Sequence, residues 1–147
     1  MPETLKICPW TDPVLDAVGH DPRSRYVETF WLPTLGPTAL LLLRHLATQF
    51  ENHPQGIDLP VADTSRSLGL GDRNGNQSPI VRSLARLEVF DLACNDGANT
   101  IAVRRNLPRL DARQLRRLPA SLRSAHAQWS ATQLAAAPPP ESATSRI

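Results

Sequence analysis

The sequence predicts an α+β fold that is mainly α-helical and carries one β-hairpin. Three observations support this prediction. Apolar residues recur at helical spacing over residues 37–50, and Ser78-Pro79 is a strong signal for the start of another helix. An alternating segment, an Asp-Gly turn and a β-branched segment follow one another over residues 90–104, which indicates a hairpin.

Three regions of different composition divide the chain. Residues 1–24 are rich in Pro, Asp and short polar side chains, and they predict a flexible N-terminal arm. Residues 25–133 hold the periodic apolar segments and predict one domain with a flanking N-terminal strip and C-terminal helices. Residues 134–147 include three consecutive prolines and predict a disordered tail.

The domain is expected to begin with an apolar strip and a central helix. The segment Tyr26–Leu35 is too apolar for a free tail, so we expect an extended strip or a short helix there. Gly36 and Pro37 mark the start of the helix over 37–50, because proline is favoured in the first helical turn. Its many leucines place this helix at the centre of the core.

Two further helices are expected around a polar loop. Residues 57–59 alternate as in a short edge strand, and a helix is expected over 61–68. The loop 71–77 contains no core residue. The helix after it, over 78–89, has its arginines mainly on the side opposite its apolar face.

The C-terminal half is expected to hold the hairpin and two helices. Residues 90–94 and 100–104 are the predicted strands. Asp111 is suited to cap a helix over 112–118, and a last helix is expected over 120–133.

Positive charge is concentrated in the second part of the chain. The net charge is only +2, but residues 61–147 carry twelve basic and seven acidic side chains, against four and seven in residues 1–60. Lys6 is the only lysine, and guanidinium groups suit bidentate contact with phosphate or guanine. A high genomic GC content explains the preference for arginine over lysine, but it does not explain the clustering.

Several functional classes are not indicated by the sequence. No apolar run approaches the roughly 20 residues that span a bilayer, and no secretion signal is recognisable. Cys8 and Cys94 are isolated, so we expect reduced thiols in a cytoplasmic protein. The histidines lack metal-ligand spacing and no nucleophile motif is present, so we expect no metal, no cofactor and no enzyme activity.

The helix and hairpin motifs carry a resemblance to a known fold. The pattern Leu59-Pro-Val-Ala62, Leu68-Gly-Leu70, Ser78–Leu87 and Phe90-Asp-Leu92 resembles the winged helix-turn-helix superfamily over residues 36–106. This resemblance implies a fold whose commonest task is binding duplex DNA.

Residues 21–129 also resemble an uncharacterised actinobacterial family of short winged-helix-like proteins, which implies a fold but no activity. Two features depart from the usual winged helix: the loop 71–77 is long, and Phe90 stands near the point where a glycine is common. The features shared with the actinobacterial family are Tyr26–Pro37, Leu68-Gly-Leu-Gly71, Ser78-Pro79 and Arg117-Leu-Pro119.

The resemblance implies that the helix starting at Ser78 lies in the major groove and that the hairpin wing reaches the adjacent backbone. Arg82 and Arg86 are four residues apart, so both side chains leave one helix face and could meet guanine or phosphate. The alternative is that they solvate a surface helix, with Glu88 and Asp91 as partners. The candidate DNA-binding residues are Arg73, Asn76, Ser78, Arg82, Ser83, Arg86, Arg104 and Arg105.

We therefore predict a DNA-binding protein, a transcriptional regulator that acts as a homodimer through its C-terminal helices. The alternative is a winged-helix module for protein–protein interaction that does not bind DNA. The small net charge, the long loop 71–77 and the apolar strip 26–35 favour this alternative.

Overall fold

The structure is a computed structural model that describes residues 3–71, 73 and 77–136. The chain divides into two compact units, Met1–Leu110 and Asp111–Ile147. The boundary differs from the single domain 25–133 expected from the sequence. It lies immediately before Asp111, the residue that starts a separate helical segment.

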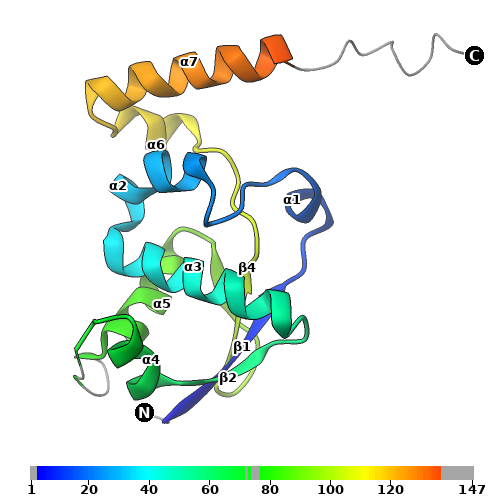
Figure 1. The fold of residues 1–147 in the computed structure, drawn as a ribbon, viewed down its shortest axis with the longest axis vertical. Helices are drawn as coiled ribbons and strands as arrows, with labels where there is room; N and C mark the ends of the chain where they lie inside the picture. Colours follow the sequence, from blue (N-terminus) through cyan, green and yellow to red (C-terminus); the bar gives the residue numbers. More distant parts are fainter. Residues whose placement is uncertain (1–2, 72, 74–76, 137–147) are drawn as a thin grey trace, which may run out of the picture. The chain divides into compact units, whose positions relative to one another are not determined.

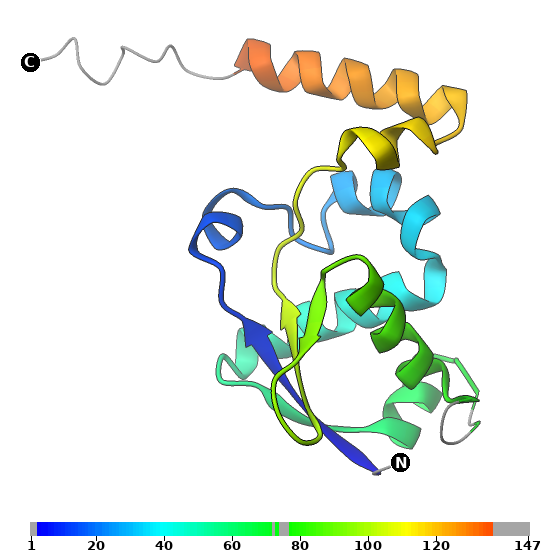
Figure 2. The ribbon, with the colours of Figure 1, turned by 180° about the vertical axis from the view of Figure 1, so that it is seen from behind.

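A four-stranded mixed sheet forms one layer of the first unit, with strand order β2-β1-β4-β3 (Figures 1 and 2). Its strands are β1 (Thr4–Trp10), β2 (Ile57–Pro60), β3 (Ala93–Asn95) and β4 (Thr100–Arg104). β1 is antiparallel to β2 and parallel to β4. The fold is therefore α+β, as the sequence predicts, and β2 is the expected edge strand.

The N-terminal segment is part of the fold, so the expectation of a flexible arm over residues 1–24 was wrong for its described part. β1 separates β2 from β4, and Leu5 and Ile7 on it are buried. The helix α1 (Pro13–Val18) follows, with Asp12 as its side-chain N-cap. A strand in the middle of a sheet gains backbone hydrogen bonds on both sides, and these override a composition typical of a free segment.

The strip before the central helix is helical. It forms a π-helix, η1 (Val27–Trp31), and one turn of α-helix, α2 (Leu32–Leu35). The indole nitrogen of Trp31 donates a hydrogen bond to the Pro108 carbonyl at 2.9 Å. Gly36 then takes φ 85°, which only glycine adopts without strain, and the chain turns into the next helix.

The central helix α3 (Pro37–Asn52) buries one apolar stripe and crosses one face of the sheet, as the two opposite views show (Figures 1 and 2). It packs against α5 (Pro79–Val89), which also contacts α4 (Val61–Ser67). The buried side chains of α3 are Ala39, Leu40, Leu42, Leu43, Leu46, Ala47 and Phe50.

The end of α5 explains why a glycine is dispensable before the hairpin. Asp91 adopts the left-handed conformation, φ 61°, and the Leu92 amide donates to the Leu87 carbonyl at 2.9 Å. This is the helix-ending motif that usually holds glycine, and aspartate is among the few other residues that tolerate it. Because of this turn, the strand that was predicted over 90–94 begins only at Ala93 in the structure.

The second unit contains two helices, α6 (Ala112–Arg116) and α7 (Ala120–Ala136). Asp111 and Gln114 form a reciprocal capping box at the start of α6, which confirms the predicted cap. The predicted tail over 134–147 is helical to Ala136, and residues 137–147 lie outside the described residues.

Candidate functional site

The helix α5 is the element expected to carry DNA contacts, and its sequence explains its position. Ile80, Leu84 and Leu87 are buried, which fixes the rotation of the helix about its axis. The same rotation leaves Arg82 exposed. Arg82 makes no ion pair and no side-chain hydrogen bond with any residue that the structure describes.

The two serines of the predicted interface are internal, which corrects their assignment as surface contacts. Ser78 is 1% exposed, and its side chain accepts a hydrogen bond from the Val81 amide at 3.4 Å. It is thus the N-cap of α5, as its sequence also predicts. Ser83 is 4% exposed and lies on the side of α5 that faces the fold.

The prediction that Arg86 contacts DNA also requires correction, because its guanidinium group binds the protein backbone. Nε donates to the Leu35 carbonyl at 2.7 Å and Nη2 donates to the Thr34 carbonyl at 2.8 Å. Both carbonyls belong to the last turn of α2, where helix geometry leaves carbonyls without intrahelical partners. Arg86 therefore ties α5 to α2. Both arginines are exposed, but Arg82 is the one whose side chain has no partner among the described residues.

Arg104 was expected to contact DNA from the wing. The structure corrects this expectation, because the Arg104 side chain holds three segments of the protein together. Its side chain is 12% exposed and its guanidinium carbon lies 3.7 Å from the centroid of the Trp10 ring. Nη1 binds the Asp12 carboxylate at 2.8 Å, and Nε donates to the Asp91 carbonyl at 2.8 Å. The Asp91 carboxylate lies 3.5 Å from Nη2, so the carboxylates of Asp12 and Asp91 together compensate the positive charge of Arg104.

Arg105 is likewise neutralised by a neighbouring carboxylate. Nη2 lies 3.0 Å from Asp16 Oδ2 on α1. The predicted wing thus presents two arginines whose charges are compensated inside the first unit. Two of the acidic partners, Asp12 and Asp16, come from the N-terminal segment, which the sequence alone did not place beside the hairpin.

The loop before α5 supplies the remaining predicted residues. Arg73 is exposed and makes no ion pair with the described residues. Asn76 lies outside the described residues.

A cleft between the start of α3 and one face of α5 was not predicted. It encloses about 490 Å³, and no carboxylate is among its described lining residues. One signal in the sequence could have drawn attention to this cleft. The residue before Pro37 is not Ser, Thr, Asp or Asn, so no side chain caps the first amides of α3. The lining residues are Leu35, Gly36, Pro37, Thr38, Ala39, Leu70, Pro79, Arg82, Ser83 and Arg86.

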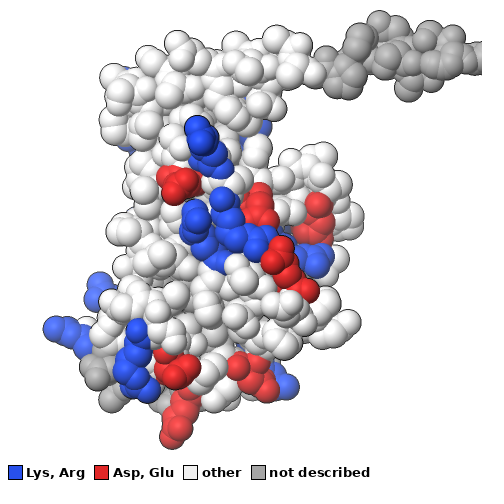
Figure 3. Space-filling model, in the orientation of Figure 1, with Lys and Arg blue, Asp and Glu red and all other residues white. Residues whose placement is uncertain are grey.

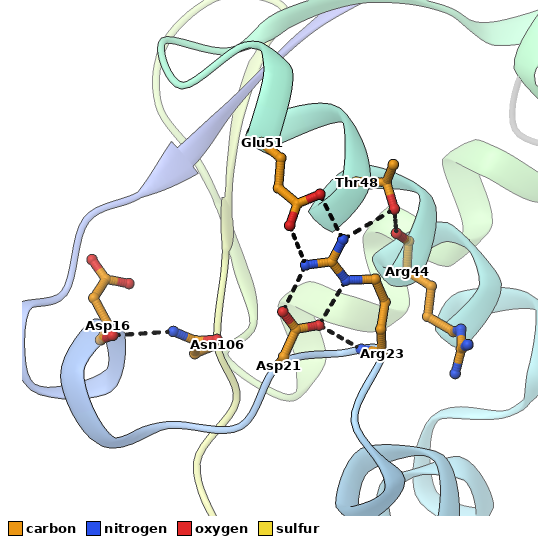
Figure 4. A network of polar contacts seen from close by, with 7 residues as sticks. All are labelled: Asp16, Asp21, Arg23, Arg44, Thr48, Glu51 and Asn106. Atoms are coloured by element: carbon orange, nitrogen blue, oxygen red, sulfur yellow. Dashed lines mark hydrogen bonds and ion pairs between the residues drawn. The ribbon is translucent and has the colours of Figure 1, made fainter.

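A second charged cluster joins the N-terminal segment to α3 (Figure 4). Arg23 lies 2.7 Å from the Asp21 carboxylate and 3.0 Å from that of Glu51, and it also donates to Thr48 Oγ1 at 3.3 Å. The pKa of Asp21 is lowered mainly by its hydrogen bonds with the Arg23 side chain. These charges are paired with one another, so the cluster has a structural role.

Basic and acidic side chains are interspersed on the face shown in Figure 3. That face therefore carries no continuous positive surface of the kind that tracks a phosphate backbone.

The cysteines do not form a disulfide bond in the structure. Cys8 and Cys94 both stand opposite Ala102, on the two strands that flank β4, so two strand spacings separate them. This separation of roughly 9–10 Å exceeds the reach of a disulfide. Burial raises the pKa of both thiols, with Asp96 adding to the effect, so neither is an activated thiolate.

Comparison with protein-family models, with curated proteins and with solved structures found no match to the chain. The described residues contain no group of three or more His, Cys, Asp or Glu side chains placed to hold a metal ion. Within the same residues, no helix combines the length and the hydropathy needed to cross a membrane.

Proposed function

We propose that residues 36–106 form a winged helix-turn-helix and that the chain binds duplex DNA through the N-terminal half of α5 and the loop before it. The observation that carries this proposal is Arg82, which is exposed and whose side chain has no partner among the described residues, on a helix held in place by its buried residues Ile80, Leu84 and Leu87. The element order α3, β2, α4, α5, β3 and β4 supports it.

The proposed interface is smaller than the one expected from the sequence. Arg82 and Arg73 are its basic residues, because Arg86, Arg104 and Arg105 are bound to internal carbonyls and carboxylates. Few phosphate contacts give weak binding by one copy, with a shallow salt dependence. Pairing of two copies through α6 and α7 would place two such helices on one duplex, and this pairing remains a prediction.

The test is fluorescence anisotropy with labelled duplex fragments over a series of salt concentrations. We expect binding at low salt, with Arg82→Gln lowering the affinity and reducing the log–log salt slope by roughly one unit, because one phosphate contact is lost. Arg25→Gln is the matched control, since Arg25 is also an exposed arginine but lies before η1.

Two outcomes would count against the proposal. Absence of binding at low salt would remove DNA as the partner, and an unchanged salt slope in Arg82→Gln would remove α5 as the contact element.

The interaction module without DNA binding stays as the second candidate. The observation that favours it is Val89 at the end of α5, which is 77% exposed. An apolar side chain beside arginines that are already paired suits a protein partner better than a phosphate backbone. A defined complex that Val89→Asp abolishes, found together with no DNA binding at low salt, would support this candidate.

A further inference from the structure

The cleft between α3 and α5 has the composition of an anion site. Its described lining residues include two arginines and two hydroxyl side chains but no Asp or Glu. Its volume of about 490 Å³ lies within the range of small-molecule sites. A positive wall without a compensating carboxylate is the reverse of the paired clusters around Arg23 and Arg104.

The start of α3 lines this cleft and carries backbone donors that have no partner among the described residues. α3 has 16 residues, and its N-cap, Gly36, offers no side chain to the first amides. Pro37 has no N–H, and the amides of Thr38 and Ala39 donate to no described residue. Ala39 is 2% exposed, so its amide lies inside the protein without a partner among the described residues. Such amides, at the positive end of a helix, bind oxyanions.

Ser83 provides an independent observation from the opposite wall. Pro79, Arg82, Ser83 and Arg86 all line the cleft, and their spacing of three, four and seven residues places them on one face of α5. Ser83 is almost fully buried, yet its hydroxyl makes no hydrogen bond with the described residues. A buried hydroxyl costs free energy unless it is hydrogen-bonded, so this group lacks a partner that the cleft has room to supply.

The two arginines have different tasks in the cleft. Arg86 is fixed by its bonds to the Thr34 and Leu35 carbonyls, so it contributes charge from a set position. Arg82 is not fixed by any described residue, so its guanidinium is available to bind an incoming anion in a bidentate manner.

We propose that this cleft is a binding site for a tetrahedral oxyanion such as a phosphate group, held by the Thr38 and Ala39 amides, the Ser83 hydroxyl and the Arg82 guanidinium. The phosphate belongs either to a free small molecule or to a nucleic-acid backbone. The site goes beyond the proposed function, because its chemistry does not require that the chain bind DNA.

The test is an NMR titration of the full-length protein with inorganic phosphate, with ionic strength held constant by sodium chloride. We expect saturable shifts of the Thr38 and Ala39 amide resonances. Arg82→Gln should weaken the affinity roughly tenfold or more, and Ser83→Ala a few-fold, because charged and neutral hydrogen bonds differ in strength. Arg25→Gln should leave the titration unchanged.

Shifts that do not saturate, or an unchanged affinity in either Arg82→Gln or Ser83→Ala, would overturn the proposal. Folding of each variant is checked by the dispersion of resonances outside the cleft.

A second arm distinguishes the sources of the phosphate. If saturating phosphate displaces a labelled duplex at constant ionic strength, the site takes a backbone phosphate. If phosphate binds while the duplex does not bind, or binds undisturbed, the site takes a free anion. Failure of DNA binding therefore refutes the proposed function without refuting the cleft.

Discussion

At the scale of single residues, Arg82 and Arg86 show how neighbours decide what an arginine does. Both belong to α5 and lie one helical turn apart. Arg86 reaches the carbonyls of Thr34 and Leu35, which lie more than 50 positions earlier in the chain, whereas Arg82 lines the same cleft without a partner among the described residues. The two side chains are of the same type, so the difference comes from the α2 carbonyls that lie within hydrogen-bond distance of Arg86.

The role of Arg86 leads to a stability prediction. Arg86→Ala should lower the free energy of unfolding by about 2 kcal/mol, because two helix-end carbonyls lose charged donors. Arg86→Lys should recover only part of this loss, since a lysine cannot donate from a planar fork. Urea denaturation measures both. Arg82→Ala is the matched control and should change stability by less than about 0.5 kcal/mol. Equal effects in the two alanine variants would contradict the assignment.

At the scale of elements, β1 is the decisive strand of the sheet. Lys6–Trp10 pairs with β4 on one side, and Thr4–Ile7 pairs with β2 on the other. The backbone of the whole sheet therefore depends on a segment whose composition favours disorder. Leu5 and Ile7 are the buried side chains of an alternating pattern too short, and too close to Pro9, to stand out in the sequence.

A pair of adjacent substitutions tests the importance of β1. Ile7 is 1% exposed, and Ile7→Ala should destabilise the protein by roughly 3 kcal/mol, because a cavity remains in the core. Lys6→Ala, on the exposed face of the same strand, should change stability by less than about 0.5 kcal/mol. Thermal and urea unfolding measure both variants. Two neutral results would mean that residues 4–10 form a loose arm after all.

At the scale of the whole molecule, carboxylates tie the N-terminal segment to the rest of the first unit. Asp12 caps α1 and binds Arg104, and Asp21 and Glu51 share Arg23. The pKa of Asp12 is lowered mainly by its hydrogen bond with the Leu15 amide, and that of Glu51 mainly by its hydrogen bond with Arg23. Folding therefore favours the ionised form of these carboxylates.

This linkage predicts acid sensitivity with a definite sign. A carboxylate with a lowered pKa in the folded state stabilises the protein above its unfolded pKa of about 4, and the benefit disappears as the pH falls through the folded value. The contribution of these carboxylates to the unfolding free energy should thus be constant above about pH 5.5 and decrease below it. Burial lowers the pKa of His45, so this histidine adds a separate decrease that begins near its unfolded pKa of about 6.5. Arg23→Gln should flatten the decrease that comes from the carboxylates, because Asp21 and Glu51 lose the partner that lowers their pKa values. Denaturation at several pH values provides the measurement, and an equal slope in wild type and Arg23→Gln would refute it.

Local rules account for the elements that the sequence placed well. The helix starts at Pro37, Pro79 and Ala112 depend on proline in the first turn or on a cap within three residues, and all are visible in a short window of sequence. The hairpin over β3 and β4 depends on the turn around Gly97. The predicted strand started too early because Asp91 adopts a conformation that the sequence pattern does not reveal.

The sequence by itself determined the class of the fold and the order of its central helices and hairpin, because helix caps and turns are interactions between residues only a few positions apart. Only the tertiary structure decided that β1 completes the sheet, that Arg104 and Arg105 are neutralised by Asp12 and Asp16, and that α3 and α5 enclose a cleft. These contacts join residues about 40 to 90 positions apart, and the free energy of such contacts depends on a packing that no local pattern records.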